Sequence, residues 1–363
     1  MNLLDDSLKL IIQPDGEATE ESLYQLGFQK MTLVTQLFYQ VVIEHQLPEL
    51  LSQISQMVPE MSQASVRFLL TRSPLESRDL LVEFLNAQPL ISATLLIKNA
   101  WFLQVLERQG LFFKYQPIFS LASGQVVAHE CLARAKTFQG HSISGQQLID
   151  AALATNLTHE FDDLARSSCL KAVAQLSTTI GTADQTATFF VNVLPNAIGC
   201  DPRSLERNFQ QVLDLGLHPE QIVFELTEVE ALGQYPELPR LIKQIRAWGF
   251  GLAIDDLGSN VSIDHYFMEF RPDVIKLDRR LIHGCSHHAL KQVMIKSLVH
   301  FAHEMEIVVL AEGLEDASDI EFCDEADVDL GQGFGLASPE LSLWQPLPSQ
   351  QFPEACRTHC HVR

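Results

Sequence analysis

From about residue 109 onward, short runs of hydrophobic residues alternate with segments whose hydrophobic positions recur at helical spacing. A short apolar run bounded by turn signals is typical of a strand buried on both faces. Strands are predicted at residues 111–120, 126–134, 188–194, 222–228, 251–257, 274–278, 307–312 and 331–337. Helices are predicted between most of them, at residues 146–177, 203–214, 236–248, 261–270, 286–305 and 316–326. This alternation predicts repeated β/α units and therefore parallel strand pairing.

The first two of these strands are joined differently from the rest. Only Ala122, Ser123, Gly124 and Gln125 separate them, whereas a parallel crossover needs a dozen or more residues. An antiparallel hairpin is therefore expected here. Because 363 residues accommodate a barrel of about 250 residues and a further module, we predict an α/β protein. Its core is a modified TIM-type (β/α)8 barrel with an antiparallel first strand.

The N-terminal part of the chain has a different pattern. Its apolar residues between positions 17 and 43 fall close to helical spacing, and prolines punctuate the segments that follow. We predict a helical module at residues 1–108, the barrel domain at 109–345 and an irregular tail at 346–363. Packing, dimerisation and signal input are the roles expected for the module. They would give the chain a homodimer contact or a protein partner through residues 1–108.

Composition and charge narrow the function classes. The formal net charge of −21 argues against a general basic surface for nucleic-acid polymers. No apolar stretch approaches the roughly 20 residues that span a bilayer, and the first residues do not follow the pattern of a signal peptide. The seven cysteines are scattered without framework spacing. We therefore expect a cytoplasmic protein without a membrane segment.

Polar residues close most of the predicted barrel strands. The hard oxygen donors among them are Glu130, Asn192, Glu225, Asp255 and Glu312. In a parallel barrel the carboxyl ends of the strands meet at one mouth, so these side chains are expected to converge. Converging carboxylates repel each other unless a cation lies between them, and Mg²⁺ and Mn²⁺ prefer oxygen ligands.

The adjacent carboxylates Asp255 and Asp256 indicate a pair of metal ions, because one can bridge while the other holds a second ion. Two such ions are a common device for phosphodiester hydrolysis. Lys276 on the run VIKLD can orient the attacking water or stabilise developing negative charge, and Asp278 can pair with it. Glu315 and Gln332 are candidates for positioning water. Taken singly, each residue is also explained as a solvated acid or a structural salt bridge, and Lys276 with Asp278 as a barrel ion pair.

Several spaced motifs over residues 109–340 together resemble the EAL-type phosphodiesterases of bacteria, which cleave the second messenger cyclic di-GMP. The matching segments are YQPI at 115–118, ECLAR at 130–134, FELTE at 224–228, DDLG at 255–258, IKLD at 275–278, AEGLE at 311–315 and QGFG at 332–335. The resemblance implies a metal-dependent hydrolase that opens the cyclic dinucleotide to linear pGpG.

The resemblance also implies roles for individual residues. The metal ligands would be Glu130, Asn192, Glu225, Asp255, Asp256 and Glu312, with Lys276 acting on the attacking water. Gln116, Leu132 and Arg134 would hold the substrate together with Asp278, and the guanidinium of Arg134 suits a phosphate. Glu228 would anchor the loop that follows the aspartate pair.

That loop departs from the family pattern. Residues 257–262 read LGSNVS, so Asn260 stands where the family has a second glycine and Val261 where it has an aromatic residue. Glycine adopts backbone angles that valine does not. The departure favours a second hypothesis, a receptor that binds the dinucleotide without efficient turnover. A third hypothesis is a protein-interaction scaffold without ligand, against which the retained acidic residues argue.

Overall fold

A computed structural model describes residues 7–180, 187–194, 201, 203–226, 238–257 and 271–344. The chain divides into two compact units. One comprises Met1–Gln104 with Asp150–Asn156, and the other Val105–Ile149 with Leu157–Arg363.

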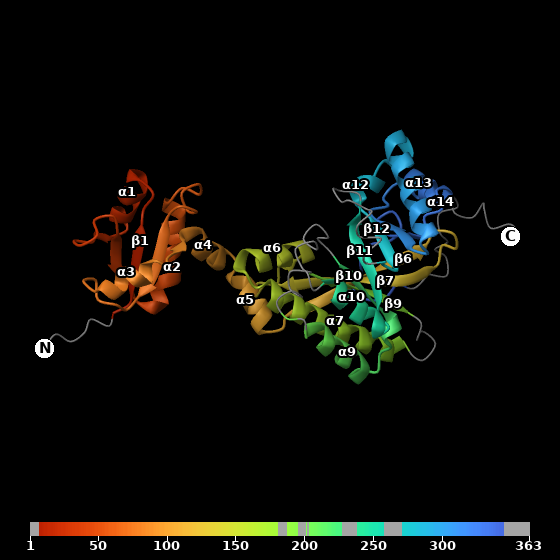
Figure 1. Cartoon of the computed structure of the whole chain (residues 1–363), viewed down its shortest axis with the longest axis horizontal. Coiled ribbons are helices and arrows are strands. Elements are labelled where there is room, and N and C mark those ends of the chain that lie inside the picture. The colour runs from red at the N-terminus through yellow and green to blue at the C-terminus, as the bar shows by residue number, and fades with distance from the viewer. Residues whose placement is uncertain are drawn as a thin grey trace. The chain divides into compact units, whose positions relative to one another are not determined.

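The N-terminal unit contains an antiparallel sheet with helices on both faces (Figure 1). Its elements are β1 (Lys9–Gln13), α1 (Glu17–Gln25), β2 (Gln29–Lys30), β3 (Phe38–Val41), α2 (Leu47–Met57), β4 (Arg67–Thr71), α3 (Arg78–Phe84), β5 (Gln88–Pro89) and α4 (Leu90–Lys98). The described strands lie in the order β2-β3-β1-β4-β5, and all neighbouring pairs are antiparallel. The elements from β1 to β4 follow the chain order β-α-β-β-α-β of the ferredoxin-like split βαβ unit, and α3, β5 and α4 come after them.

The strand β1 lies at the centre of this sheet and uses both of its faces. Leu10 and Ile12 pack with Leu23 of α1 and Ile54 of α2. Ile11 points to the opposite face and packs with Leu80 of α3. This alternation is expected for a strand, in which successive side chains point to opposite faces.

The prediction of a purely helical N-terminal module is therefore wrong in part. The helices α1 and α2 are present, but residues 38–41 form a strand that pairs with β1 in the register Ile12–Phe38. Gly27, with a φ of 86°, lies just after α1 and separates it from the strands. The apolar residues that suggested one long helical pattern belong to two kinds of element.

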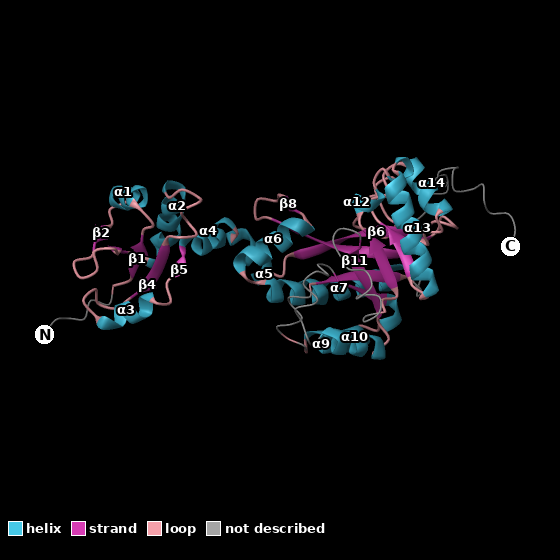
Figure 2. Cartoon of the chain, turned by 45° about the horizontal axis from the view of Figure 1, so that its top comes forward, coloured by secondary structure: helices cyan, strands magenta, loops and turns pink. Residues whose placement is uncertain are grey.

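The second unit is a barrel, whose strands are surrounded by helices (Figure 2). Its strands are β6 (Leu111–Ser120), β7 (Val126–Lys136), β9 (Thr188–Val193), β10 (Ile222–Leu226), β11 (Gly251–Leu257), β12 (Val274–Leu277), β13 (Val308–Ala311) and β14 (Leu330–Gly331), with the short β8 (Ser142–Ile143) beside β7. Its longer helices are α7 (Thr158–Ile180), α9 (Ser204–Asp214), α10 (Leu238–Ala247), α13 (Ala289–Glu304) and α14 (Ala317–Glu325).

The described barrel strands close into a ring in the order β6-β14-β13-β12-β11-β10-β9-β7, with a final pairing between β7 and β6. The strand β6 is antiparallel to both of its neighbours, and all other pairs in the ring are parallel. The predicted barrel with one antiparallel first strand is confirmed.

The predicted strand and helix bounds need two corrections. The helical pattern at 146–177 is divided into α6 (Gly145–Thr155) and α7, because Asn156 adopts a φ of 57° between them. The last strand ends at Gly331 rather than near residue 337. A Cβ atom on Gly333 would lie 2.1 Å from the Leu314 carbonyl oxygen, so this segment packs closely against the neighbouring backbone. The predicted helix at 261–270 lies outside the described residues.

The interior of the barrel is built in two layers. The lower layer is apolar and consists of Ile118, Ala128, Phe190, Val223, Ala253, Val274 and Leu310, with Leu330 packed against it. Side chains two positions apart on a strand point to the same face. The residues two positions nearer the mouth are Gln116, Glu130, Asn192, Glu225, Asp255, Lys276, Glu312 and Gln332. The strand pattern therefore places a polar layer directly above an apolar one.

Among the described residues, no single helix is long and apolar enough to cross a membrane. The consecutive helices α4 and α5 (Ala100–Glu107), bent by 58° relative to each other, pass the same test as a pair by length and composition alone.

Candidate active site

Lys276 lies at the centre of the polar layer and is 1% exposed. Its Nζ lies 2.5 Å from a carboxylate oxygen of Glu225 and 2.5 Å from one of Glu312. Carboxylate oxygens of Glu130 and Asp255 lie at 3.5 and 3.7 Å. Among the described residues, one ammonium group thus faces four carboxylates from β7, β10, β11 and the residue after β13, a formal excess of three negative charges.

Glu130 is held by two amide groups. Asn192 Nδ2 donates to its Oε1 at 3.2 Å, and Gln332 Nε2 donates to its Oε2 at 2.7 Å. One donor comes from β9, which pairs with β7, and the other from the residue after β14, which lies beyond β6 in the ring. The carboxylate of Glu130 is therefore oriented by the same neighbours that line the mouth.

The buried charges shift each other's ionisation. Burial opposes ionisation of Glu130, but the Lys276 charge and the amide hydrogen bonds outweigh it, so the pKa of Glu130 is lowered. Burial, with repulsion from the neighbouring carboxylates, outweighs Lys276 at Glu225 and raises the pKa of that carboxyl. The same causes raise the pKa of Glu312 to about 8. Burial alone would lower the pKa of Lys276, but the four carboxylates raise it well above its ordinary value.

The donor set fits a divalent metal ion. Oxygens of Glu225, Asp255 and Glu312 all lie within 4.8 Å of one another. The second carboxylate oxygen of Glu225 is buried and has no hydrogen-bond partner among the described residues. A buried carboxylate oxygen without a partner is costly, and hard oxygen donors are the ligands that Mg²⁺ and Mn²⁺ prefer.

Two cavities open beside this cluster, and Glu130 lines both. The larger, of about 510 Å³, is also lined by Leu132, Arg134, Asn192 and Asp255. The smaller, of about 250 Å³, has walls that include Gln116, Glu312, Glu315 and Gln332. The larger volume lies in the range of small-molecule sites.

Most of the predicted site residues are thus brought together, but Asp278 is not among those lining these cavities. Its carboxylate accepts a hydrogen bond from the Arg280 backbone N–H at 2.5 Å and caps the helix α12 (Arg279–Ile282). The alternative of a Lys276–Asp278 ion pair is not seen, because Lys276 contacts the four carboxylates named above. Glu315 forms an ion pair with Arg279 at 2.9 Å.

Several predictions fall outside the described residues. These are the side chain of Asp256, the loop anchor Glu228, residues 258–262 of the altered loop and the tail from residue 346.

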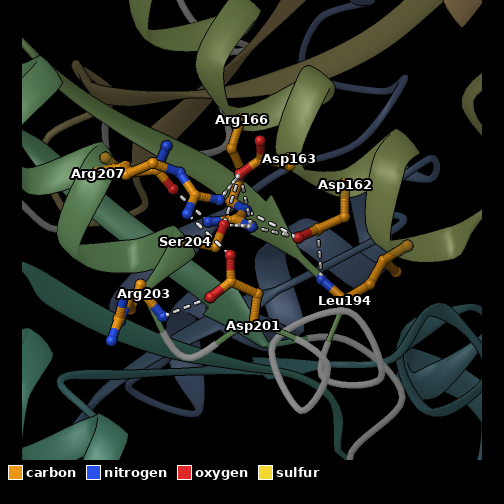
Figure 3. A network of polar contacts seen from close by, with 9 residues as sticks. Asp162, Asp163, Arg166, Leu194, Asp201, Arg203, Ser204 and Arg207 are labelled. Atoms are coloured by element: carbon orange, nitrogen blue, oxygen red, sulfur yellow. Dashed lines mark hydrogen bonds and ion pairs between the residues drawn. The ribbon is translucent and has the colours of Figure 1, made fainter.

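A second buried polar cluster was not predicted from the sequence. It centres on Arg166 of α7, which is fully buried (Figure 3). Its guanidinium contacts Asp162, Ser204 and Asn208. The spacing of Asp162 and Arg166, four residues apart on a helix, is the one signal that sequence analysis could have used.

Fold and site together define a TIM-type barrel protein with an acidic site at the carboxyl ends of its strands. A family model described as the EAL domain matches residues 99–339, and the chain belongs to the EAL domain family.

Curated relatives carry two kinds of description. The blue light- and temperature-regulated antirepressor BluF of Escherichia coli (strain K12) is 25% identical over 242 residues, which are 67% of this chain and 57% of BluF. The cyclic di-GMP phosphodiesterase PdeB of Shewanella oneidensis is 28% identical over 249 residues, covering 68% of this chain and 28% of PdeB. The chain therefore matches only part of the length of these relatives.

Solved structures support the fold. The PaMucR phosphodiesterase in complex with c-di-GMP has a TM-score of 0.60 at 22% identity, covering 67% of this chain and 97% of that chain. The EAL domain of Xanthomonas citri FimX, in complex with c-diGMP, has a TM-score of 0.60 at 19% identity, covering 70% and 96%. At this identity the likeness concerns the fold.

Proposed function

We propose that the barrel hydrolyses cyclic di-GMP to linear pGpG with the help of Mg²⁺ or Mn²⁺, most simply as a pair of ions. The observation that carries this proposal is the convergence of four carboxylates on Lys276 at the barrel mouth. Such an excess of buried negative charge is costly unless cations enter the site. Relatives named as cyclic di-GMP phosphodiesterases supply the substrate class.

The ions would be held by Glu130, Asn192, Glu225, Asp255 and Glu312, with Asp256 as a further ligand. When bound, they supply a nucleophilic water and neutralise charge on the phosphate. Lys276 would then serve as the residue that orients the water and stabilises the negative charge that develops. Gln332 supports this arrangement because it fixes the Glu130 carboxylate. Glu315, in the smaller cavity, would help to position water.

The two cavities suit a substrate with two halves. A cyclic dinucleotide carries two bases on one ribose–phosphate ring, and Glu130 lines both cavities. Leu132 and Arg134 would contact it in the larger cavity and Gln116 in the smaller one. We assign Asp278 a supporting role through α12 rather than direct contact, because its carboxylate caps that helix.

Incubation of the purified protein with cyclic di-GMP and Mg²⁺, and separately with Mn²⁺, tests the proposal. Chromatography should show the linear dinucleotide, and Glu130→Ala should abolish its formation. Arg207→Met, an exposed change in the first turn of α9, is the control and should retain activity. Unchanged turnover by Glu130→Ala would contradict the site assignment.

A receptor is the second candidate function. The observation that favours it is the sequence of residues 257–262, where Asn260 and Val261 replace a glycine and an aromatic residue of the family pattern. In that case calorimetry should detect binding of the intact dinucleotide, while no linear product forms with either metal. If calorimetry detects no binding of cyclic di-GMP, both proposed functions are wrong.

A further inference from the structure

We infer that Arg166 is a positioning residue for the metal ligand Asn192, acting through Asp162 and the end of β9. This inference rests on the proposed function, because it takes Asn192 as a ligand of the metal site. Arg166 itself lies in the helical layer around the barrel and does not touch the mouth.

The guanidinium of Arg166 fixes one oxygen of Asp162. Arg166 Nε and Nη2 lie 2.8 and 2.6 Å from Asp162 Oδ2. On the other side, Nη2 donates to Ser204 Oγ at 2.7 Å and Nη1 donates to Asn208. Because Ser204 and Asn208 belong to α9, Arg166 joins two helices around a single buried carboxylate, as Figure 3 shows.

The other oxygen of Asp162 holds the end of β9. The Leu194 backbone N–H donates to Asp162 Oδ1 at 2.9 Å. On the side of β7, the last paired residue of β9 is Val191, which lies opposite Cys131. On the side of β10 the pairing continues through Asn192 and Val193. Beyond Val191, the strand end is therefore held by β10 on one side and by the contact between Leu194 and Asp162.

Asn192 lies between these two points of attachment. It follows Val191, precedes Leu194 by two residues, and lines the larger cavity together with Leu194 and Asp162. Its amide donates to Glu130. A shift of the β9 end would therefore move the amide oxygen available to a metal ion and the orientation of Glu130.

The network also has an exposed end that provides a control. Arg207, whose side chain is 52% exposed, binds Asp163 at 3.2 Å and Asp201 at 2.8 Å. Asp163 in turn accepts from Ser204 Oγ at 2.6 Å. Arg207 thus belongs to the same network, but its ion pairs go to Asp163 and Asp201 rather than to the carboxylate that holds Leu194.

A double-mutant cycle separates positioning from general structural support. The affinity for Mn²⁺ alone is measured by electron paramagnetic resonance for Arg166→Met, Asn192→Ala and the combination, well below their unfolding temperatures. Arg166→Met should weaken Mn²⁺ binding at least fivefold in the wild-type background but less than twofold in the Asn192→Ala background. Arg207→Met should change it less than twofold. The coupling arises because Arg166 acts through Asn192.

Equal losses in both backgrounds, or no loss in either, would overturn the inference. If Arg166→Met does not fold, Arg166→Lys takes its place. Lysine keeps the positive charge but cannot contact Asp162 with two nitrogen atoms at once, so it should also weaken Mn²⁺ binding in the wild-type background and not in the Asn192→Ala background. A wild-type protein that binds Mn²⁺ without hydrolysing cyclic di-GMP fails only the proposed reaction. Failure of the wild-type protein to bind Mn²⁺ would overturn the inference itself.

Discussion

The barrel contains two clusters that are each centred on a fully buried cation, and they differ in charge balance. Arg166 contacts the carboxylate of Asp162 and the neutral groups of Ser204 and Asn208. A further carboxylate, that of Asp163, lies 4.0 Å away and also pairs with Arg207. Lys276 instead faces four carboxylates among the described residues. The first cluster is close to neutral, whereas the second carries an excess of negative charge.

This difference separates a cluster that holds the fold from one that can do chemistry. A balanced buried pair is complete, and every charged atom finds a partner within the protein. An unbalanced cluster is incomplete, because it keeps a buried carboxylate oxygen of Glu225 without a partner. Such a site gains most from a ligand of opposite charge.

Removal of the positive charge of Arg166 should have the largest effect on the free energy of unfolding. Arg166→Met leaves Asp162 buried without its cation and should cost about 3–5 kcal/mol. Arg166→Met combined with Asp162→Asn should cost less, because the amide oxygen can still accept from Leu194 without carrying a charge. Urea unfolding followed by circular dichroism measures both. A double variant as unstable as the single one would contradict the charge-balance argument.

Loss of the cation in the Lys276 cluster should act mainly on turnover. Lys276→Met should lower kcat by about 10²–10³-fold, the effect typical of removing one donor that stabilises developing charge. Steady-state kinetics with cyclic di-GMP provide the measurement, and Arg207→Met is the control. Activity within tenfold of the wild type would show that Lys276 balances charge without taking part in the reaction.

Metal bound at the unbalanced cluster should stabilise the folded protein. At a Mn²⁺ concentration 100 times its Kd, the free energy of unfolding should rise by about 2.7 kcal/mol. Thermal unfolding with Mn²⁺ and with a chelator measures this shift. Asp255→Ala should abolish the shift and Arg207→Met should preserve it. A shift retained in Asp255→Ala would place the metal elsewhere.

Substitution of Arg207, at the exposed end of the Arg166 network, should have the smallest effect on the free energy of unfolding. Arg207→Met should change the free energy of unfolding by less than about 0.5 kcal/mol at pH 7. The Arg207 hydrogen bond lowers the pKa of Asp201 below its ordinary 3.8. The contribution of this hydrogen bond to stability is fully present above the pKa that Asp201 has in the unfolded chain. It is lost as the pH falls through the lower pKa that Asp201 has in the folded protein. Urea unfolding at pH 7 and pH 3 should therefore show a smaller difference from the wild type at the lower pH.

The barrel could be predicted because its strands are continuous apolar runs with a polar residue at a fixed place. Glu130, Glu225 and Asp255 each stand two residues beyond a small or branched interior residue. Because residues two positions apart on a strand point to the same face, this spacing places the three carboxylates in the barrel interior, and their convergence could be predicted from the sequence. The length of the last strand was overestimated most, since Gly333 and Gly335 pack on neighbouring backbone instead of extending the sheet.

Other features depend on contacts that no local pattern reveals. The strands β2 and β5 of the N-terminal sheet have two residues each, too few for a periodic signal. The Arg166 cluster requires α7 and α9 to lie side by side, which is a matter of tertiary packing. The cap at Asp278, by contrast, carried a readable signal, because aspartate directly before a helix commonly caps it.

The two-layer interior of the barrel has a consequence for how such a protein can change over generations. The apolar layer, from Ile118 to Leu330, is separate from the polar residues above it. Substitutions in the polar layer can therefore alter chemistry while the closed ring of strands survives. A protein with this fold can therefore lose its catalytic activity during evolution, still bind a ligand and remain folded.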